Sequence, residues 1–345
     1  MREGPNGPRA AVRGAGFGVL SRFHELGVPV PEGYDAVPGD FPPPAADYPD
    51  LWWTTFGEPR LTELIETALA ENPDLGAAAA RVEQAQAQAR IAGAALSPQV
   101  DASGSAGRNR QNFIGFPIPG SDEQVLSSTS TSLGVSLNVA WEADLWGRLR
   151  AARSSAVARA EASAADLAGF ELSLAGQVAK TWFSLQEAAA QAVLAQETVD
   201  NRQSSEERIR RRFEAGLRPA LDLRLALAER ASAEALLAQR LQQADAVARQ
   251  LETLVGAYPR ADVEAAPELP APPPPPPVGV PSELLVRRPD LAAAELRLAS
   301  AGFSVAEARA NLYPQLRLTG SAGRRSQELE DLFDSDFTVW SLAAN

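Results

Sequence analysis

Glu142 and Asp144 are two carboxylates separated by one residue, a spacing that could set a general acid beside a general base. They stand where a strand pattern gives way to a helix pattern, and that position explains both residues more simply. An aspartate just before a helix caps its free N–H groups, and a glutamate at the rim of a strand is a solvated charge. We therefore predict that the pair shapes a junction and that the protein is not an enzyme.

The rest of the sequence excludes most other kinds of chemistry. Its 345 residues include no cysteine and one histidine, His24, which removes disulfides, thiolate sites and histidine-based metal sites. No phosphate-binding loop or dinucleotide-binding glycine pattern occurs. The net charge of −12 and the lack of a basic cluster argue against nucleic-acid binding. We predict no cofactor, no metal and no nucleic-acid partner.

Signals for membrane targeting are weak at the N-terminus. Residues 1–50 are rich in Gly, Pro and Asp, which predicts an extended, poorly ordered leader. Their apolar run, Ala15–Leu20, is too short and too rich in glycine to be the core of a signal peptide. No apolar run reaches the roughly 18 residues of a transmembrane helix. Either the protein stays in the cytoplasm or this N-terminus is not the natural one.

The stretch that holds Glu142 changes its hydrophobic period. In a predicted strand at 131–142, small or polar residues alternate with apolar ones, namely Leu133, Val135, Leu137, Val139 and Trp141. A period of two gives a strand one apolar face and one small or polar face. From Gly147 the pattern is helical to residue 213, a length of roughly 100 Å. A strand that runs directly into so long a helix is unusual in a soluble domain.

The remaining elements follow from heptads and breakers. Apolar residues every seven positions, with alanine at the other seam position, predict coiled-coil packing. The charged run 206–212 is interpreted as a solvated helix face before a turn at Gly216 and Pro219. The predicted order is a helix at 59–71, a helix at 73–96, a strand at 99–108, a polar loop at 109–129, a strand at 131–142, a helix at 147–213 and a helix at 220–255.

The sequence repeats itself after a proline-rich linker at 257–281. Residues 289–323 match 73–107 without a gap at an offset of 216, and 16 of these 35 aligned positions are identical. Residues 51–256 therefore form a first repeat and 282–345 a second. The second copy ends as its second strand begins, so we expect a truncated chain without a second long hairpin.

These patterns predict a mainly α fold with membrane β-strands. Strands that face lipid on one side and water on the other must close into a barrel, because a bilayer does not tolerate open edges. Four strands per full-length chain are too few to close a pore, so several chains must combine. We predict β-barrel strands joined to long coiled-coil hairpins, which continue the barrel wall as a helical tunnel.

The motifs resemble those of the TolC-like outer-membrane efflux proteins, in particular the NodT-type lipoproteins of RND drug-efflux systems. The likeness covers about residues 28–345. It rests on Trp52-Trp53 and Asn72-Pro73-Asp74-Leu75, on Trp141-Glu142-Ala143-Asp144-Leu145-Trp146-Gly147-Arg148, on Arg287-Arg288-Pro289-Asp290, and on Asn311-Leu312-Tyr313-Pro314.

The resemblance implies a homotrimer in the outer membrane with its helices in the periplasm. It implies passive export of drugs or other small molecules, delivered by a periplasmic adaptor and an inner-membrane transporter. By this likeness Gly216 and Leu217 form the adaptor-docking tip, and Asp222 lies at the aperture. The barrel meets the tunnel at Trp141, Glu142, Asp144, Trp146, Gly147 and Arg148, and the residues that face outer-membrane lipid are Leu133, Val135, Leu137 and Val139.

Three alternatives stay open. The channel could instead serve type I protein secretion. The chain could be a non-functional fragment, since residues 1–27 hold neither a signal peptide nor a lipidated cysteine and the second hairpin is absent. A soluble, alanine-rich coiled-coil scaffold is the third alternative, and the apolar alternation from Leu133 to Trp141 argues against it.

Overall fold

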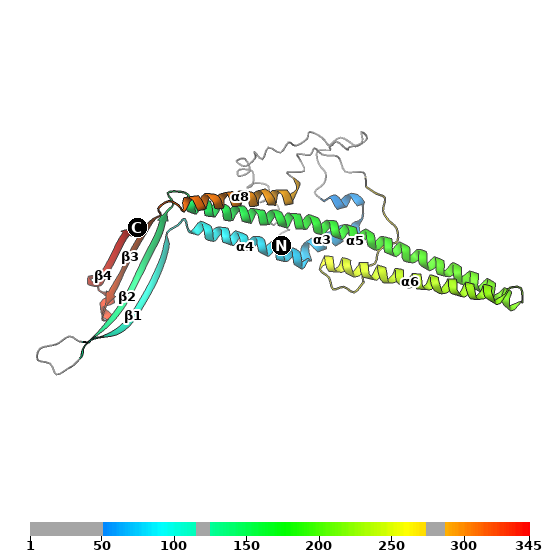
Figure 1. The fold of residues 1–345 in the computed structure, drawn as a ribbon, viewed down its shortest axis with the longest axis horizontal. Coiled ribbons are helices and arrows are strands. Elements are labelled where there is room, and N and C mark those ends of the chain that lie inside the picture. The colour runs from blue at the N-terminus through cyan, green and yellow to red at the C-terminus, as the bar shows by residue number, and fades with distance from the viewer. Residues whose placement is uncertain (1–50, 115–124, 274–286) are drawn as a thin grey trace, which may run out of the picture. The chain divides into compact units, whose positions relative to one another are not determined.

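The computed structural model describes residues 51–114, 125–273 and 287–345 (Figure 1). Two compact units result, one of the described residues up to Val82 with Ser163–Ala294, the other of Glu83–Ala162 and Glu295–Asn345. The elements are η2 (Trp52–Phe56), α3 (Pro59–Glu71), α4 (Pro73–Ala94), β1 (Gln99–Ile114), β2 (Val125–Ala143), α5 (Arg148–Glu214), α6 (Ala220–Val255), α8 (Pro289–Ala310), β3 (Leu316–Ser326), η3 (Glu330–Phe333), η4 (Ser335–Phe337) and β4 (Thr338–Ala344).

Helices α5 and α6 lie within one residue of their predicted bounds, but the first two strands are longer than predicted. The polar loop expected at 109–129 is wrong at all of its described residues, 109–114 and 125–129, because β1 and β2 pair from Gln99↔Ala140 out to Ile114↔Val125. Residues 108–112 and 127–132 are polar or small on both faces, so a period of two had no apolar signal there.

Four predicted segments lie partly or wholly beyond the described residues. The leader at 1–50 is outside them, and so are residues 115–124 of the polar loop, 274–281 of the linker and 282–286 of the second repeat. The described part of the linker, 257–273, contains neither helix nor strand.

An apolar core holds the first unit together, with side chains from η2, α3, α5 and α6. Leu61 and Ile65 lie one turn apart on α3 and are fully buried, as are Val178 of α5 and Leu251 of α6. Full burial of a side chain of this size contributes about 1.5–3 kcal/mol. The core therefore fixes the short helix α3 against the middle of α5 and the end of α6.

Asn72 joins the turn between α3 and α4 to the end of α6. Its carboxamide oxygen accepts hydrogen bonds from the backbone N–H groups of Asp74 at 2.9 Å and Leu75 at 3.0 Å, which caps α4. Its Nδ2 donates to the carbonyl of Leu254 at 2.9 Å. Gly256 follows with a φ of 87°, and a Cβ there would lie 2.7 Å from the carbonyl oxygen of Glu71. Glycine alone fits this close approach.

Glu252 is a buried carboxylate near the end of α6. Its oxygens accept hydrogen bonds from four consecutive backbone N–H groups, those of residues 260–263, at 2.6 to 3.2 Å. Burial on its own would raise the pKa of Glu252, but these four donors bring the pKa below its ordinary value. Ala261, with a left-handed φ of 63°, bends the chain around the carboxylate. The first residues after α6 are thereby fixed to it.

In the second unit, three serines join α5 to α8. The Oγ of Ser155 lies 3.0 Å from both the Oγ of Ser300 and the Oγ of Ser304. Ser300 Oγ donates to the carbonyl of Ser155 at 3.0 Å, and Arg159 Nε donates to Ser300 Oγ at 3.1 Å. Because Ser155 and Ser300 are buried, a slip between the helices would leave hydroxyls without partners. The cluster therefore sets the register of this helix pair.

Within the described part of the chain, no helix is both long enough and apolar enough to cross a bilayer. The same residues contain no group of three or more acidic, histidine or cysteine side chains placed to hold a metal ion.

Candidate functional site

The four strands form one antiparallel sheet in the order β1-β2-β3-β4, and their register defines its two faces. Residues directly opposite each other share a face. Leu137 lies opposite Ala102 on β1 and Ala322 on β3, and Ala322 lies opposite Trp340 on β4. One face, the apolar face, therefore carries Val100, Ala102, Ala106, Leu133, Val135, Leu137, Val139, Trp141, Leu316, Leu318, Ala322, Trp340 and Leu342.

Much of the apolar face is not covered by the chain itself. Val135 is 52% exposed, Leu137 48% and Trp340 77%, while Leu133 and Val139 are half-buried. An exposed apolar surface of this extent requires an apolar partner or a lipid.

The opposite face is small and polar. Ser103 and Ser136 lie 2.8 Å apart through their hydroxyls, and Asn138 donates to Ser103 at 3.3 Å. Ser321 and Ser341 make the same contact at 2.8 Å between β3 and β4. On β1 and β2, the side chains of this face from Asp101 to Gly107 and from Ser132 to Ala140 are short, and most carry donors or acceptors, so this part of the face suits water as its neighbour.

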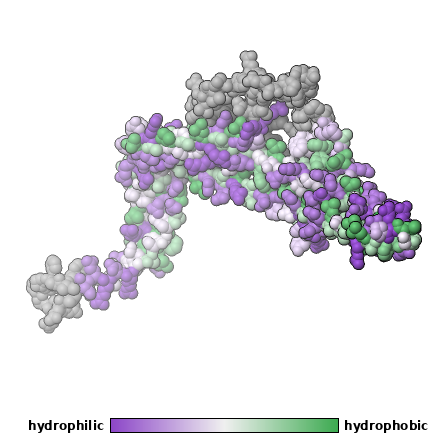
Figure 2. All heavy atoms as spheres, turned by 45° about the vertical axis from the view of Figure 1, so that its right-hand side comes forward, coloured by the Kyte–Doolittle hydropathy of each residue, from purple (hydrophilic) through white to green (hydrophobic). Residues whose placement is uncertain are grey.

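The apolar band on β2 is about as long as a membrane-crossing strand. Leu133 to Trp141 covers nine residues, or about 27 Å along the strand, and a strand needs roughly 9–11 residues to cross a bilayer. Beyond Leu133 the same face continues with Thr131 and Thr129. Figure 2 shows this change as a purple outer end, next to the grey atoms, after paler and green atoms along the sheet.

Asp144 connects the sheet to α5. Its carboxylate accepts hydrogen bonds from the backbone N–H groups of Leu149 at 3.1 Å and Arg150 at 3.0 Å, and from Arg150 Nε at 3.1 Å. Burial alone would raise the pKa of Asp144, but these donors lower it below its usual value. Gly147, with a φ of 79°, makes the turn between the strand and the helix. The geometry is that of a helix cap.

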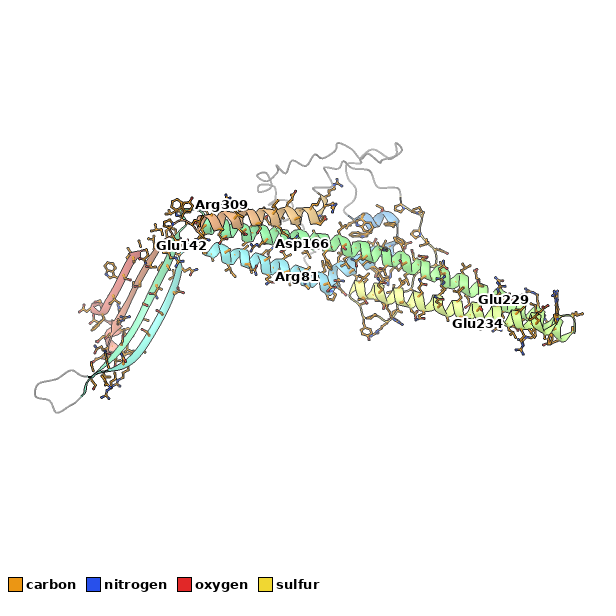
Figure 3. All side chains as sticks on the ribbon, in the orientation of Figure 1. Arg81, Glu142, Asp166, Glu229, Glu234 and Arg309 are labelled. Atoms are coloured by element: carbon orange, nitrogen blue, oxygen red, sulfur yellow. The ribbon has the colours of Figure 1, made fainter. Side chains whose placement is uncertain are left out.

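Glu142, labelled in Figure 3, lies at the same junction and pairs with arginine. Arg148 donates to both carboxylate oxygens of Glu142, with each Nη2 distance at 2.8 Å. Arg317, from β3, lies 3.8 Å from the second oxygen. The prediction of a solvated rim charge is therefore incomplete, because Glu142 is largely buried and paired. Sequence reasoning missed Arg317, which no local pattern links to Glu142.

Aromatic residues complete the junction. Trp141 Nε1 donates to the carbonyl of Leu96 at 3.0 Å, and Trp146 Nε1 donates to that of Pro314 at 2.9 Å. Trp146 also stacks on Tyr313, with ring centroids 4.9 Å apart. The structure thus brings the six predicted junction residues together with Tyr313, which belongs to the quoted motif before β3.

At the other end of α5, the turn to α6 presents the predicted tip residues. Gly216 has a φ of 70°, its N–H donates to the carbonyl of Phe213 at 2.8 Å, and the N–H of Leu217 donates to that of Arg212 at 2.8 Å. Leu217 is 74% exposed. Asp222 lies in the first turn of α6 and pairs with Arg218 at 3.0 Å.

Glu206 departs from the predicted solvated face of 206–212. It is buried, and it accepts hydrogen bonds from Arg210 on its own helix and from Arg230 on α6, the latter at 3.1 Å. These bonds, first that from Arg230 and then that from Arg210, hold the pKa of Glu206 below its ordinary value. Arg230 Nε also donates to Glu234 of α6, labelled in Figure 3, at 2.7 Å. An ion network therefore links the two helices near the turn.

A comparison with known proteins decides the family. The family model described as "Outer membrane efflux protein" matches residues 64–257 and 280–345. The chain belongs to the outer membrane efflux protein family. The family resemblance predicted from the motifs is confirmed, and so is the fold class of long helices with membrane strands.

Individual members of the outer membrane efflux protein family are similar to this chain in sequence and in structure. The pyoverdine export outer membrane protein OpmQ of Pseudomonas putida is 38% identical over 294 residues, 83% of this chain. This chain spans 61% of the length of that relative. A solved structure of the outer-membrane channel OprN matches 92% of this chain and 70% of its own with a TM-score of 0.79 and 30% identity. The Campylobacter jejuni CmeC outer membrane channel, at 23% identity and a TM-score of 0.81 over 92% of this chain and 68% of its own, supports the fold alone.

Proposed function

We propose that this chain is a subunit of an outer-membrane channel through which a tripartite efflux system exports small molecules passively from the periplasm to the exterior. The observation that carries the proposal is the two-faced sheet, with an apolar band of membrane length on one side and hydroxyls on the other. Lipid would cover the apolar face at Leu133, Val135, Leu137 and Val139, and the serine-lined face would border the aqueous path.

The sheet also supports a homotrimer. Strands β1 and β4 are its edges, and four strands cannot close around a pore. Open edges are not tolerated in a bilayer, so other copies must supply the neighbours of β1 and β4. Three chains would share one barrel, and their α5–α6 hairpins would extend from the junction into the periplasm as a tunnel.

The hairpin turn is the proposed contact with the periplasmic adaptor, which in turn joins the inner-membrane transporter. Leu217 is exposed beside Gly216, whose left-handed backbone gives the tip its shape. Asp222, one turn further on, would hold the closed aperture through polar contacts. Its observed partner is Arg218 of the same turn, so opening need not break the α5–α6 pair.

Small molecules are the substrate class we favour over secreted proteins. The compared relative OpmQ is named for pyoverdine export, and TtgF, another Pseudomonas putida protein that is 34% identical over 84% of this chain, is named as a toluene efflux pump protein. No described feature favours type I secretion.

Deletion of the gene in its host tests the proposal. We expect sensitivity to a panel of antibiotics and solvents to rise and to return to normal when the gene is restored. Unchanged sensitivity to every compound would overturn the proposal, and loss of a secreted protein from the medium instead would favour the type I alternative. A matched pair, Leu137→Arg on the apolar face and Asn138→Arg on the polar face, should separate lipid contact from a general charge effect. Only the first should abolish complementation, since arginine on a lipid face costs about 2–4 kcal/mol at mid-membrane.

A further inference from the structure

The apolar face of the sheet ends in arginine in both copies of the repeat. On β1 the face runs from Val100 through small residues to Ala106 and then reaches Arg108. On β3 the equivalent run goes from Leu316 to Ala322 and then reaches Arg324. Arg108 and Arg324 are separated by the same 216 residues that relate the repeats. Both copies therefore change from apolar to cationic at the same step of the strand.

We propose that Arg108 and Arg324 form a cationic rim that binds the phosphate groups of lipids at the edge of the apolar band farthest from the helix junction. This inference rests on the proposed function, because it takes the apolar face to lie in a bilayer.

The spacing places the rim at a lipid headgroup level. Val100 and Arg108 are eight residues apart, as are Leu316 and Arg324, which is about 27 Å along the strand. At the usual strand tilt of 35–45° this distance spans roughly 20 Å of membrane height, close to the 25 Å apolar band of membrane strands. Beyond Arg108 the same face continues with Arg110 and Asn112, which require water.

The guanidinium groups of these arginines have N–H donors that bond to no described residue. Arg108 is exposed and makes no hydrogen bond or ion pair with another described residue. Arg324 uses one N–H, which donates to the carbonyl of Leu332 at 3.1 Å. Arg110 likewise uses one, which donates to Ser127 at 3.1 Å. A guanidinium offers five N–H donors in a planar fork that fits a phosphate through two oxygens. A phosphate with uncompensated negative charge is thus a better match than the zwitterionic headgroup of phosphatidylcholine, whose ammonium offsets the charge of its phosphate.

A lipid is favoured over free phosphate because the rim adjoins the apolar face. Only a molecule with both an acyl chain and a phosphate can contact Ala106 or Ala322 and the neighbouring arginine together. Free inorganic phosphate would gain nothing from the apolar residues, so it serves as a competitor in the test.

The test is a lipid titration of the purified full chain in detergent, followed by native mass spectrometry. We expect wild type to bind phosphatidic acid more tightly than phosphatidylcholine. Arg108→Gln/Arg324→Gln should weaken phosphatidic acid binding by about fivefold for each arginine removed, with phosphatidylcholine binding unchanged. Arg108→Lys/Arg324→Lys should retain most of the preference. Inorganic phosphate should compete weakly.

The charge-matched control is Arg211→Gln/Arg325→Gln. Arg325 follows Arg324 but lies on the opposite face, and Arg211 lies on α5. An equal loss of phosphatidic acid binding in the two double variants would show a nonspecific charge effect and overturn the proposed rim. Wild type that binds phosphatidic acid and phosphatidylcholine equally would also overturn it. Far-UV circular dichroism should be the same for all variants, since the replaced side chains are outside the core.

One measurement separates this proposal from the proposed function. Wild type is added to phosphatidylcholine vesicles, and protection of the sheet from protease is followed. No protection would overturn the membrane role and the rim with it. Protection without a phosphatidic acid preference would overturn the rim alone.

Discussion

The helix–strand unit α4–β1 and its copy α8–β3 share a backbone plan but differ in the partners of their side chains. Leu75 and Leu291, Leu96 and Leu312, and Pro98 and Pro314 are identical between the copies, whereas several changed residues contact another element in one copy only. The informative differences, first copy before second, are Asn72 and Arg288, Gln84 and Ser300, Gln88 and Ser304, Ser97 and Tyr313, and Asp101 and Arg317. Duplication thus supplied a common frame, and a few polar and aromatic changes decide which neighbour each copy accepts. Exchanging residues between the copies tests this directly.

The largest effect should come from Asn72→Arg, which gives α4 the residue of α8. Asn72 is buried and makes three hydrogen bonds, so the exchange removes a cap, leaves Leu254 without its donor and buries a charge. We expect the free energy of unfolding to fall by about 3 kcal/mol, measured by urea unfolding in detergent. The reciprocal control Arg288→Asn is exposed and should change it by less than about 0.5 kcal/mol. Equal losses of stability in Asn72→Arg and Arg288→Asn would contradict the conclusion that the two copies depend on different side-chain contacts.

The serine cluster should give the next effect. Ser300→Gln/Ser304→Gln forces two longer side chains between α5 and α8 and disrupts the bonds to Ser155. A loss of about 2 kcal/mol is expected from overpacking and unpaired hydroxyls. Gln84→Ser/Gln88→Ser on exposed positions of α4 is the matched control and should be nearly neutral. A neutral result for the α8 variant would show that the cluster does not set the register.

Tyr313→Ser should cost about 1 kcal/mol, because it removes the stack on Trp146. A double-mutant cycle with Trp146→Leu measures the coupling of the two rings, and Ser97→Tyr, between α4 and β1, provides the reciprocal exchange. Additive single effects would mean that the rings do not interact.

Arg317→Asp brings a carboxylate towards Glu142 in place of a guanidinium. Since Arg317 is largely exposed, the expected loss is only about 0.5 kcal/mol, and it should shrink further at high salt. Unfolding at low and high salt distinguishes this charge effect from lost packing, which salt does not reduce.

The smallest effect is a pH dependence confined to one copy. Arg288, through its hydrogen bonds, lowers the pKa of Asp290. A lowered pKa stabilises the start of α8 above the unfolded value of about 4, and this contribution is lost as the pH falls through the lowered native value. Asn72 does not titrate in this range, so its cap on α4 should persist. Amide exchange, corrected for intrinsic rates, should show faster opening at low pH in residues 291–294 than in residues 75–78. Asp290→Asn should remove this difference.

Local periodicity predicted much of the fold. It did not predict features that depend on contacts between residues far apart in sequence. Leu133 to Trp141 indicated the apolar face because large side chains alternate there. The outer strand residues 127–129 lacked that contrast, and the sequence predicted a loop there. Glu206 stands in a charged run whose residues all look equally solvated. Its burial depends on Arg230, whose approach is set by the return of α6.

The same limit applies to the candidate site. The cap and the ion pair of the junction involve residues close in sequence, from Glu142 to Arg150, whereas Trp141 and Trp146 bond to Leu96 and Pro314, which no local pattern indicated. Arg317 reaches Glu142 only through the pairing of β2 with β3, which no short-range pattern encodes. The two-faced character of the sheet was predictable on β2, but its extension to Trp340 needed the observed register.

The backbone N–H groups of residues 260–263 form an anion receptor around the carboxylate of Glu252. The ligand of this receptor is therefore part of the same chain. A tethered ligand binds at a high effective concentration, so solvent anions compete with it poorly. Binding in such a receptor is also reciprocal: unwinding the last turn of α6 would release the segment, and pulling on the segment would destabilise that turn. The four hydrogen bonds at Glu252 therefore couple the conformation of residues 260–263 to the last turn of α6.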